Sequence, residues 1–235
     1  MRLLLLSNST NAGEGFLQYA LPYLEEFIGR KAVKPLFIPY AAVTMSFDAY
    51  ANKVKDTLNT AGCDIDPIHL YDDPVEAVQM ADCIMVGGGN TFHLLNLLQV
   101  NSLIDVIVRR VKQGIPYIGW SAGSNIAAPT ICTTNDMPII QPESFKALNL
   151  VPFQINPHYL DAHPSGHAGE TREMRINEYI EVNPNRYVVG LREGTLLRIE
   201  NEQIRLIGKR KARIFGHGMS PLELGWKDDF SLLWR

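Results

Sequence analysis

The 235-residue chain has few cysteines and no long apolar run, and each absence excludes a class of protein. Its three cysteines, an odd number at wide spacing, match neither a disulfide framework nor a metal-binding pattern. No apolar stretch approaches the ~20 residues that cross a bilayer, and the apolar part of MRLLLLSNST is too short for a signal peptide. We therefore expect a cytoplasmic protein with reduced cysteines and no membrane contact.

The sequence also lacks any concentration of charge of one sign. Its 22 basic and 25 acidic residues give a net charge of −3, without a basic block, an acidic tail or a low-complexity tract. This balance argues against a protein that binds nucleic acid by neutralising phosphates. The chain is long enough for one substantial core, and no linker rich in Gly, Ser or Pro divides it, so we predict a single domain over residues 1–235.

Short apolar segments alternate with amphipathic ones through the first half of the chain. The segments LLLL, PLFIPY, DPIHLY, CIMV and IPYIGW are predicted strands, and the stretches between them are predicted helices. Continuous apolar strands that alternate with helices indicate a parallel sheet covered on both faces. The second half contains the predicted strands QINPH, RYVVGLRE and KARIFG, a helix in TREMRINEYI and a hairpin in TLLRIENEQIRLIG. We expect an α/β fold with three layers, a doubly wound and mostly parallel sheet and a C-terminal β-hairpin region.

The segment IGWSAGSN contains the most informative motif. Gly119, Ser121 and Gly123 fit the pattern Gly-x-Ser-x-Gly, which places a serine on a sharp turn between a strand and a helix. A nucleophilic serine needs a base that takes its proton and a third group that orients the base. His158 and Glu193 each lie at the end of a predicted strand, where ligands of open parallel sheets bind. The three residues therefore form a candidate catalytic set.

The glycine run GGGN supplies the remaining chemical requirement, which is a set of backbone donors for the developing oxyanion. The N–H groups of Ala122, directly after the serine, and of Gly89, in the glycine run, are the candidate donors. The chain order Ser, His, Glu differs from the order Ser, acid, His of α/β-hydrolases. That fold is therefore a poor match.

Six motifs in chain order give the sequence a family resemblance: LLLLSNST, VGGGNTF, YIGWSAGSN, TTNDMPI, QINPHY and GHAGETRE. Over most of the chain it resembles the serine peptidases that include the aspartyl dipeptidase peptidase E and cyanophycinase. The resemblance implies a sheet like that of class I glutamine amidotransferases, with serine where those enzymes have a nucleophilic cysteine. It also implies hydrolysis of dipeptides with an N-terminal aspartate, without a metal or another cofactor.

Carried over residue by residue, the resemblance implies that Ser121 is the nucleophile and His158 the general base. Asp136 in TTNDMPI and Glu193 in LREG both match acidic positions that could complete the triad. We favour Glu193, because it lies beyond a predicted parallel strand on the same edge as Ser121, whereas Asp136 lies in irregular chain. We expect Asp136 in the site too, holding the substrate amine or the histidine network.

Substrate binding is assigned to two residues. Arg172 in GETRE is the candidate for the substrate's aspartyl carboxylate, because a guanidinium suits bidentate contact with a carboxylate. Asn90 in VGGGNTF is the second candidate substrate-binding residue. The aspartate preference itself follows from the resemblance alone.

The sequence offers three alternatives to the dipeptidase. A zinc enzyme using His158, His163 and His167 is disfavoured, because Pro164 and Gly166 interrupt any helix that could present the last two on one face. A non-catalytic protein with an amidotransferase-like fold is disfavoured because every chemical role is filled. A related serine hydrolase of another acidic peptide, isoaspartyl or cyanophycin-derived, stays open. The expected partner is a small peptide, and the expected assembly is a monomer or a homodimer.

Overall fold

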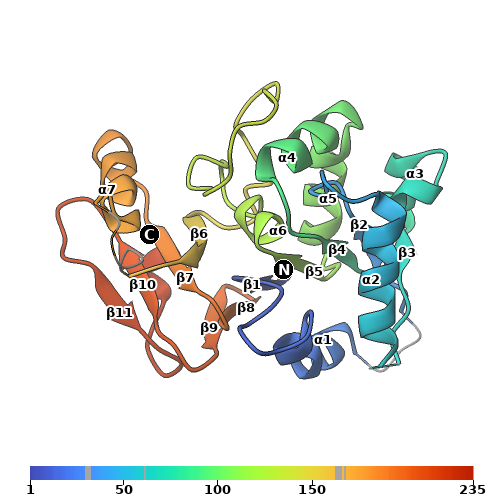
Figure 1. Cartoon of the computed structure of the whole chain (residues 1–235), viewed down its shortest axis with the longest axis horizontal. Coiled ribbons are helices and arrows are strands. Elements are labelled where there is room, and N and C mark those ends of the chain that lie inside the picture. The colour runs from blue at the N-terminus through green and yellow to red at the C-terminus, as the bar shows by residue number, and fades with distance from the viewer. Residues whose placement is uncertain (30–32, 61, 162–165, 167, 235) are drawn as a thin grey trace.

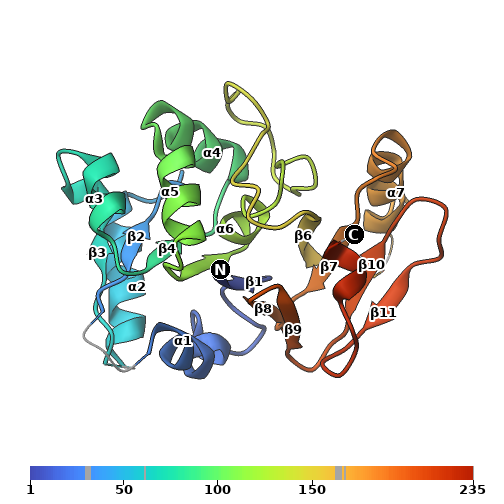
Figure 2. The same ribbon diagram turned by 180° about the vertical axis from the view of Figure 1, so that it is seen from behind.

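The chain folds around two β-sheets that lie side by side (Figure 1). The structure is a computed structural model, and it describes residues 1–29, 33–60, 62–161, 166 and 168–234. Figure 2 shows the same arrangement from behind, with the larger sheet and its helices on one side and the smaller sheet and α7 (Arg172–Val182) on the other. No single described helix is long and apolar enough to cross a bilayer. Helices α4 (Thr91–Val100) and α5 (Leu103–Lys112) meet that test only as a pair, which is bent by 93°.

The larger sheet has seven strands, and five consecutive strands, counted from one edge, are parallel. In spatial order the strands are β3 (Asp66–Pro67), β2 (Leu36–Ile38), β4 (Ile84–Val86), β5 (Tyr117–Trp120), β1 (Arg2–Leu6), β8 (Leu196–Glu200) and β9 (Gln203–Ile207). Strand β8 pairs antiparallel with β1, and β9 pairs antiparallel with β8. The predicted α/β class with a mostly parallel sheet is confirmed, and the likeness to class I glutamine amidotransferases stays a prediction.

Helices cover both faces of the larger sheet, as the apolar character of its strands requires. They are α1 (Leu21–Ile28), α2 (Phe47–Asn59), α3 (Pro74–Met80), α4 (Thr91–Val100), α5 (Leu103–Lys112) and the short α6 (Ala122–Asn125). Side chains of β1 alternate: Leu3 and Leu5 pack in the cluster with α3, α4 and α5, whereas Leu4 and Leu6 pack in the cluster with α1 and α2. The segment LLLL is therefore a central strand buried on both faces.

Two predicted element boundaries illustrate what local sequence decides. Asp73 caps the N-terminus of α3, as expected. One of its carboxylate oxygens accepts from the N–H groups of Val75 and Glu76 at 2.8 and 3.1 Å. The prediction of a strand over all of DPIHLY is wrong. Only Asp66–Pro67 pairs with β2, and Ile68–Leu70 forms a 3-10 helix.

The smaller sheet corrects the prediction that one sheet contains all the site strands. In spatial order it consists of β11 (Leu222–Leu224), β10 (Ala212–Phe215), β7 (Val188–Arg192) and β6 (Gln154–Tyr159), with α7 (Arg172–Val182) on one face. Strands β6 and β7 are parallel, and β7, β10 and β11 are antiparallel neighbours. The strands that carry His158 and Glu193 are therefore in a different sheet from β5. Glycine at position 194, with φ of 77°, lets the chain turn out of β7 and enter β8 of the larger sheet.

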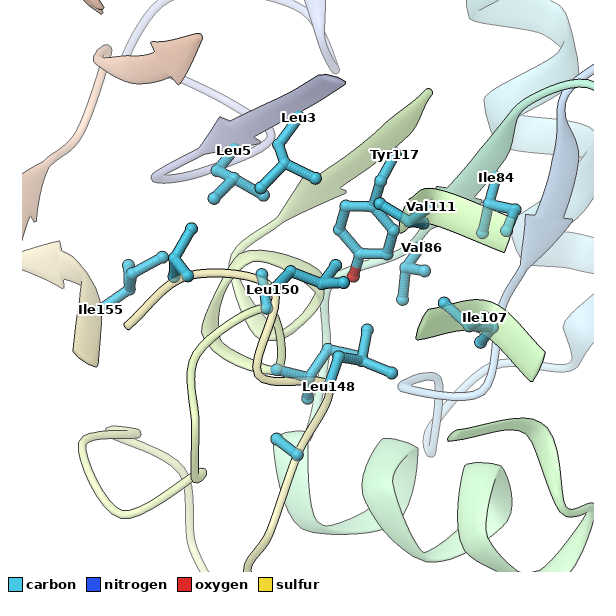
Figure 3. Close-up of a cluster of buried hydrophobic side chains, with 14 of the residues drawn as sticks. Leu3, Leu5, Ile84, Val86, Ile107, Val111, Tyr117, Leu148, Leu150 and Ile155 are labelled. Carbon is cyan, nitrogen blue, oxygen red and sulfur yellow. The ribbon is translucent and has the colours of Figure 1, made fainter. Parts of the chain in front are cut away.

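One hydrophobic cluster joins the two sheets. Figure 3 shows Leu150, from the segment before β6, between Tyr117 of the larger sheet and Ile155 of the smaller one, with Leu148 of the same segment on the side of Ile107. These side chains are all buried. The relative position of the two sheets therefore depends on the core and not on surface contacts alone.

The central position of β1 predicts a large effect of truncation there. Leu5 is fully buried and Leu70, in a 3-10 helix, is 68% exposed. We expect Leu5→Ala to lower the free energy of unfolding by about 2–5 kcal/mol, because it removes buried methyl groups and leaves a cavity. Leu70→Ala is the matched control and should change it by less than about 0.5 kcal/mol. Urea denaturation of both variants measures the difference, and equal losses would contradict the burial of β1.

Candidate active site

Ser121 lies on a tight turn between β5 and α6. Its backbone has φ of 52°, a region that residues with a β-carbon rarely adopt. The flanking glycines make the turn possible: a β-carbon on Gly119 would lie 2.3 Å from the carbonyl oxygen of Gly123, and one on Gly123 would lie 2.2 Å from that of Val86. Only glycine fits at either position, and the serine is held at the carboxyl end of β5.

The glycine run after β4 packs directly against this turn. A β-carbon on Gly88 would lie 3.0 Å from the β-carbon of Ser121, and one on Gly89 would lie 2.1 Å from the carbonyl oxygen of Ala41. Within the described parts of the chain, no acceptor is bonded to the N–H group of Gly89 or Ala122. Both predicted oxyanion donors therefore have no hydrogen-bond partner among the described residues, and their catalytic role stays a prediction.

The structure brings Ser121, His158 and Glu193 into one chain of hydrogen bonds. The Nε2 atom of His158 lies 3.0 Å from Ser121 Oγ, and its Nδ1 atom lies 2.7 Å from Glu193 Oε1. Because a carboxylate can only accept, Nδ1 carries the proton of that bond and Nε2 is left to accept from the serine hydroxyl. This is the arrangement that serine chemistry requires, assembled from strands of two different sheets.

Asp136 lies apart from that chain of hydrogen bonds. Its Oδ2 atom accepts from the backbone N–H of Thr91 at 2.7 Å, from the Thr91 hydroxyl at 2.5 Å and from the Thr134 hydroxyl at 3.1 Å. These bonds attach the loop that contains Asp136 to the first turn of α4, where the helix dipole favours a negative charge. In the part of the chain that the structure describes, no hydrogen bond links Asp136 to His158.

The side chain of Asn90 also connects α4 to this loop. Its Oδ1 atom accepts from the N–H of His93 at 3.0 Å, which caps the helix, and its Nδ2 atom donates to the carbonyl of Met137 at 2.8 Å. The structure thus gives the Asn90 side chain two structural contacts, the helix cap and the bond to Met137. A role in substrate binding stays a prediction.

Arg172 is the first residue of α7 and points toward the loop that contains Asp136. Its Nη1 atom donates to Oδ1 of Asn135, whose Nδ2 atom donates to the carbonyl of Pro157 at 2.7 Å, directly before His158. The guanidinium is half-buried, and burial together with the nearby charge of Arg175 lowers its pKa. Within the described residues it forms no ion pair, so an anion bound there would meet an uncompensated positive charge.

Sequence reasoning missed the arginine that precedes the candidate acid. Arg192 is buried, and it pairs with Asp161 through Nε and Nη2 and with Glu223 through Nη1 and Nη2, the latter two bonds at 2.8 Å. Nη1 also donates to the carbonyl of Lys211 at 2.6 Å, so all five N–H donors are used. The network ties the chain after His158 to the end of β7, and its partners are too distant in sequence for any local pattern to indicate them.

Two further observations concern metal binding. The part of the chain that the structure describes contains no group of three or more His, Cys, Asp or Glu side chains placed to hold a metal ion. His163 and His167, weighed above as zinc ligands, lie outside the described residues.

Comparison with known proteins gives consistent matches over nearly the whole chain. The family model of peptidase family S51 matches residues 3–207. The chain is 50% identical to peptidase E of a Nostoc species, covering 99% of this chain and 96% of that protein, and 48% identical to peptidase E of Streptomyces coelicolor, covering 99% and 95%. A solved peptidase structure from an acI-B1 actinobacterium superimposes with a TM-score of 0.71 at 18% identity, over 98% of this chain and 96% of that one, which shows a shared fold.

The Arg192 network predicts a loss of stability in acid. Its hydrogen bonds hold the pKa of the Asp161 and Glu223 carboxyls below their ordinary values of 3.8 and 4.5. A carboxyl whose pKa is lowered in the folded state stabilises the fold at a pH above its ordinary pKa. That stabilisation is lost as the pH falls through the lowered pKa. We expect the urea concentration at the unfolding midpoint to decrease as the pH is lowered from about 5 to about 3. The decrease should be smaller in the Asp161→Asn, Glu223→Gln double variant.

The matched control is Asp56→Asn, which removes an exposed carboxylate that has no ion pair among the described residues. It should keep the pH dependence of the wild type. A double variant with the same acid sensitivity as the wild type would show that the network does not contribute to it.

Proposed function

The chain belongs to peptidase family S51 and is a serine peptidase, and from that premise we propose that it hydrolyses dipeptides with an N-terminal aspartate. The observation that carries the proposal is the continuous set of hydrogen bonds from Glu193 through His158 to Ser121, at 2.7 and 3.0 Å. We further propose a single-domain cytoplasmic enzyme, monomeric or homodimeric, that acts without a metal or another cofactor.

The proposed reaction proceeds through an acyl-enzyme. Ser121 Oγ attacks the carbonyl carbon of the aspartyl residue while its proton passes to His158 Nε2, and Glu193 stabilises the imidazolium that forms. The N–H groups of Gly89 and Ala122 bind the oxyanion. The C–N bond then breaks and His158 gives the proton to the leaving amine; a water molecule, activated by His158, hydrolyses the ester and frees aspartate.

Arg172 is proposed to bind the side-chain carboxylate of the substrate. Three observations support this: the guanidinium is half-buried, it has no carboxylate partner among the described residues, and Asn135 connects it to the backbone next to His158. A charge-assisted, bidentate contact would fix the acyl part of the substrate against Ser121.

Asp136 is proposed to bind the substrate's amino group. Its Oδ2 atom is occupied by the two threonines, whereas its Oδ1 atom accepts no hydrogen bond from the described residues. A carboxylate with one free oxygen beside the site suits the α-ammonium of a dipeptide. The alternative substrate, an isoaspartyl or cyanophycin-derived peptide, would place its charged groups differently against the same two residues.

The division of roles between the two acids is directly testable. We expect Glu193→Gln to lower kcat for Asp-Leu by up to ~10⁴-fold with little change in KM, because the histidine then loses its orienting carboxylate. Asp136→Asn should mainly raise KM, by about 10-fold, because it weakens a binding contact only. Steady-state kinetics on variants shown to be folded by circular dichroism measure both. A large loss of kcat in Asp136→Asn alone would reverse the assignment.

The carboxylate contact predicts a change in selectivity. Arg172→Met should reduce kcat/KM for Asp-Leu by about 10- to 100-fold, the worth of a hydrogen-bonded charge pair, and should leave any slow cleavage of Ala-Leu within about threefold. Arg175→Met, which removes an exposed arginine from the same helix, is the matched control and should change neither. Equal losses on both substrates in Arg172→Met would contradict the assignment.

A further inference from the structure

Ser7 is a buried hydroxyl at the junction of the two sheets, and the mechanism above gives it no task. It directly follows β1 and is fully buried. Its Oγ atom accepts from the backbone N–H of His158 at 2.9 Å and donates to the carbonyl of Leu191 at 2.6 Å. The side chain directly after β1 of the larger sheet thus contacts both β6 and β7 of the smaller sheet.

The backbone of His158 needs such a partner because it departs from the regular ladder. The pairing of β6 with β7 shifts register between Pro157 and Tyr159, and His158 lies at that bulge with φ of 53°. A bulge leaves one residue outside the ladder and turns its side chain in a new direction. A left-handed conformation at a non-glycine residue persists only where its surroundings hold it. The Ser7 hydroxyl is the group that bonds this N–H.

The residues on either side of Ser7 bond the backbone at Ser121 and next to Glu193. The carbonyl of Leu6 accepts from the N–H of Ser121 at 3.1 Å. The Oδ1 atom of Asn8 accepts from the N–H of Gly194, directly after Glu193, at 2.9 Å. Three consecutive residues therefore fix the backbone at the nucleophile, at the base and beside the acid.

We propose that Ser7 is a positioning residue of the peptidase reaction, whose hydroxyl holds the His158 imidazole between Ser121 Oγ and Glu193 Oε1. The inference rests on the proposed serine mechanism. Ser7 touches neither substrate nor reacting atoms; it acts through the backbone of His158. Its removal therefore slows proton transfer and acylation without weakening substrate binding, because displacing a reacting group by about 1 Å can cost ~10²-fold in rate.

A purely structural role makes a different prediction. If Ser7 only stabilised the fold, its removal would lower the fraction of folded protein and leave the turnover of each folded molecule unchanged. Thr133→Val provides the matched control. Thr133 is also buried, and its hydroxyl donates to the carbonyl of Ile155 on β6, the strand that carries His158, at 2.9 Å. That variant removes a buried hydrogen bond to the same strand and leaves the His158 N–H paired.

The experiment compares wild type, Ser7→Ala, Ser7→Thr and Thr133→Val by two readouts. The first is kcat and KM for Asp-Leu. The second is the rate at which a small fluorophosphonate labels Ser121. This labelling requires the serine and the histidine, but it does not require an aspartyl substrate. We expect Ser7→Ala to lower kcat and labelling by about 10- to 100-fold with KM within about threefold. Ser7→Thr keeps the hydroxyl and should recover most of both rates, and Thr133→Val should stay within about threefold of wild type.

The outcomes separate this proposal from the proposed function. If wild type is labelled and Ser7→Ala reacts at the wild-type rate per folded molecule, the positioning role is wrong while the serine mechanism stands. An equal loss in Thr133→Val would also overturn it. A wild type that neither cleaves nor becomes labelled would remove the mechanism and this proposal together. If Ser7→Ala does not fold, Ser7→Cys, whose thiol is slightly larger and bonds only weakly, takes its place and should show a smaller loss of the same kind.

Discussion

The site depends on the hydrogen bonds that the end of β1 makes across the junction of two sheets. The Leu6 carbonyl, the Ser7 hydroxyl and the Asn8 amide hold the backbone at Ser121, at His158 and next to Glu193. Strand β1 can do this because it lies inside the larger sheet, between β5 and β8, with leucines packed on both faces. The precision of the site therefore depends on a buried strand inside the larger sheet.

Paired and unpaired arginines have different tasks around this junction. Arg192 uses all its donors on Asp161, Glu223 and a backbone carbonyl, so it fixes the chain on both sides of the histidine and acid pair and has nothing left for a ligand. Arg172 has one amide contact and no carboxylate partner among the described residues, at the edge of the same region. A saturated guanidinium supports structure, whereas an unsaturated one has donors left for an anion.

Features set by local chemistry could be predicted from the sequence, and those set by distant pairing could not. The buried strand LLLL, the cap at Asp73 and the glycines around Ser121 follow from residue types within a few positions. The separation of β6 and β7 into a second sheet follows from pairings with β10 and β11 that no local pattern indicates. Glu193 contacts His158, and its role as the third member of the triad stays a prediction. The expected reason for that contact, a sheet edge shared with Ser121, is wrong, because β5 and β7 belong to different sheets.

The most direct test of the account is the hydrolysis of Asp-Leu, Ala-Leu and isoAsp-Leu by wild type and by Ser121→Ala, all in excess EDTA. We expect wild type to cleave Asp-Leu far faster than the other two and Ser121→Ala to lose this activity. Preferred cleavage of isoAsp-Leu would keep the serine mechanism and change the substrate. Cleavage of Asp-Leu that survives in Ser121→Ala, or that EDTA abolishes, would contradict the central claim.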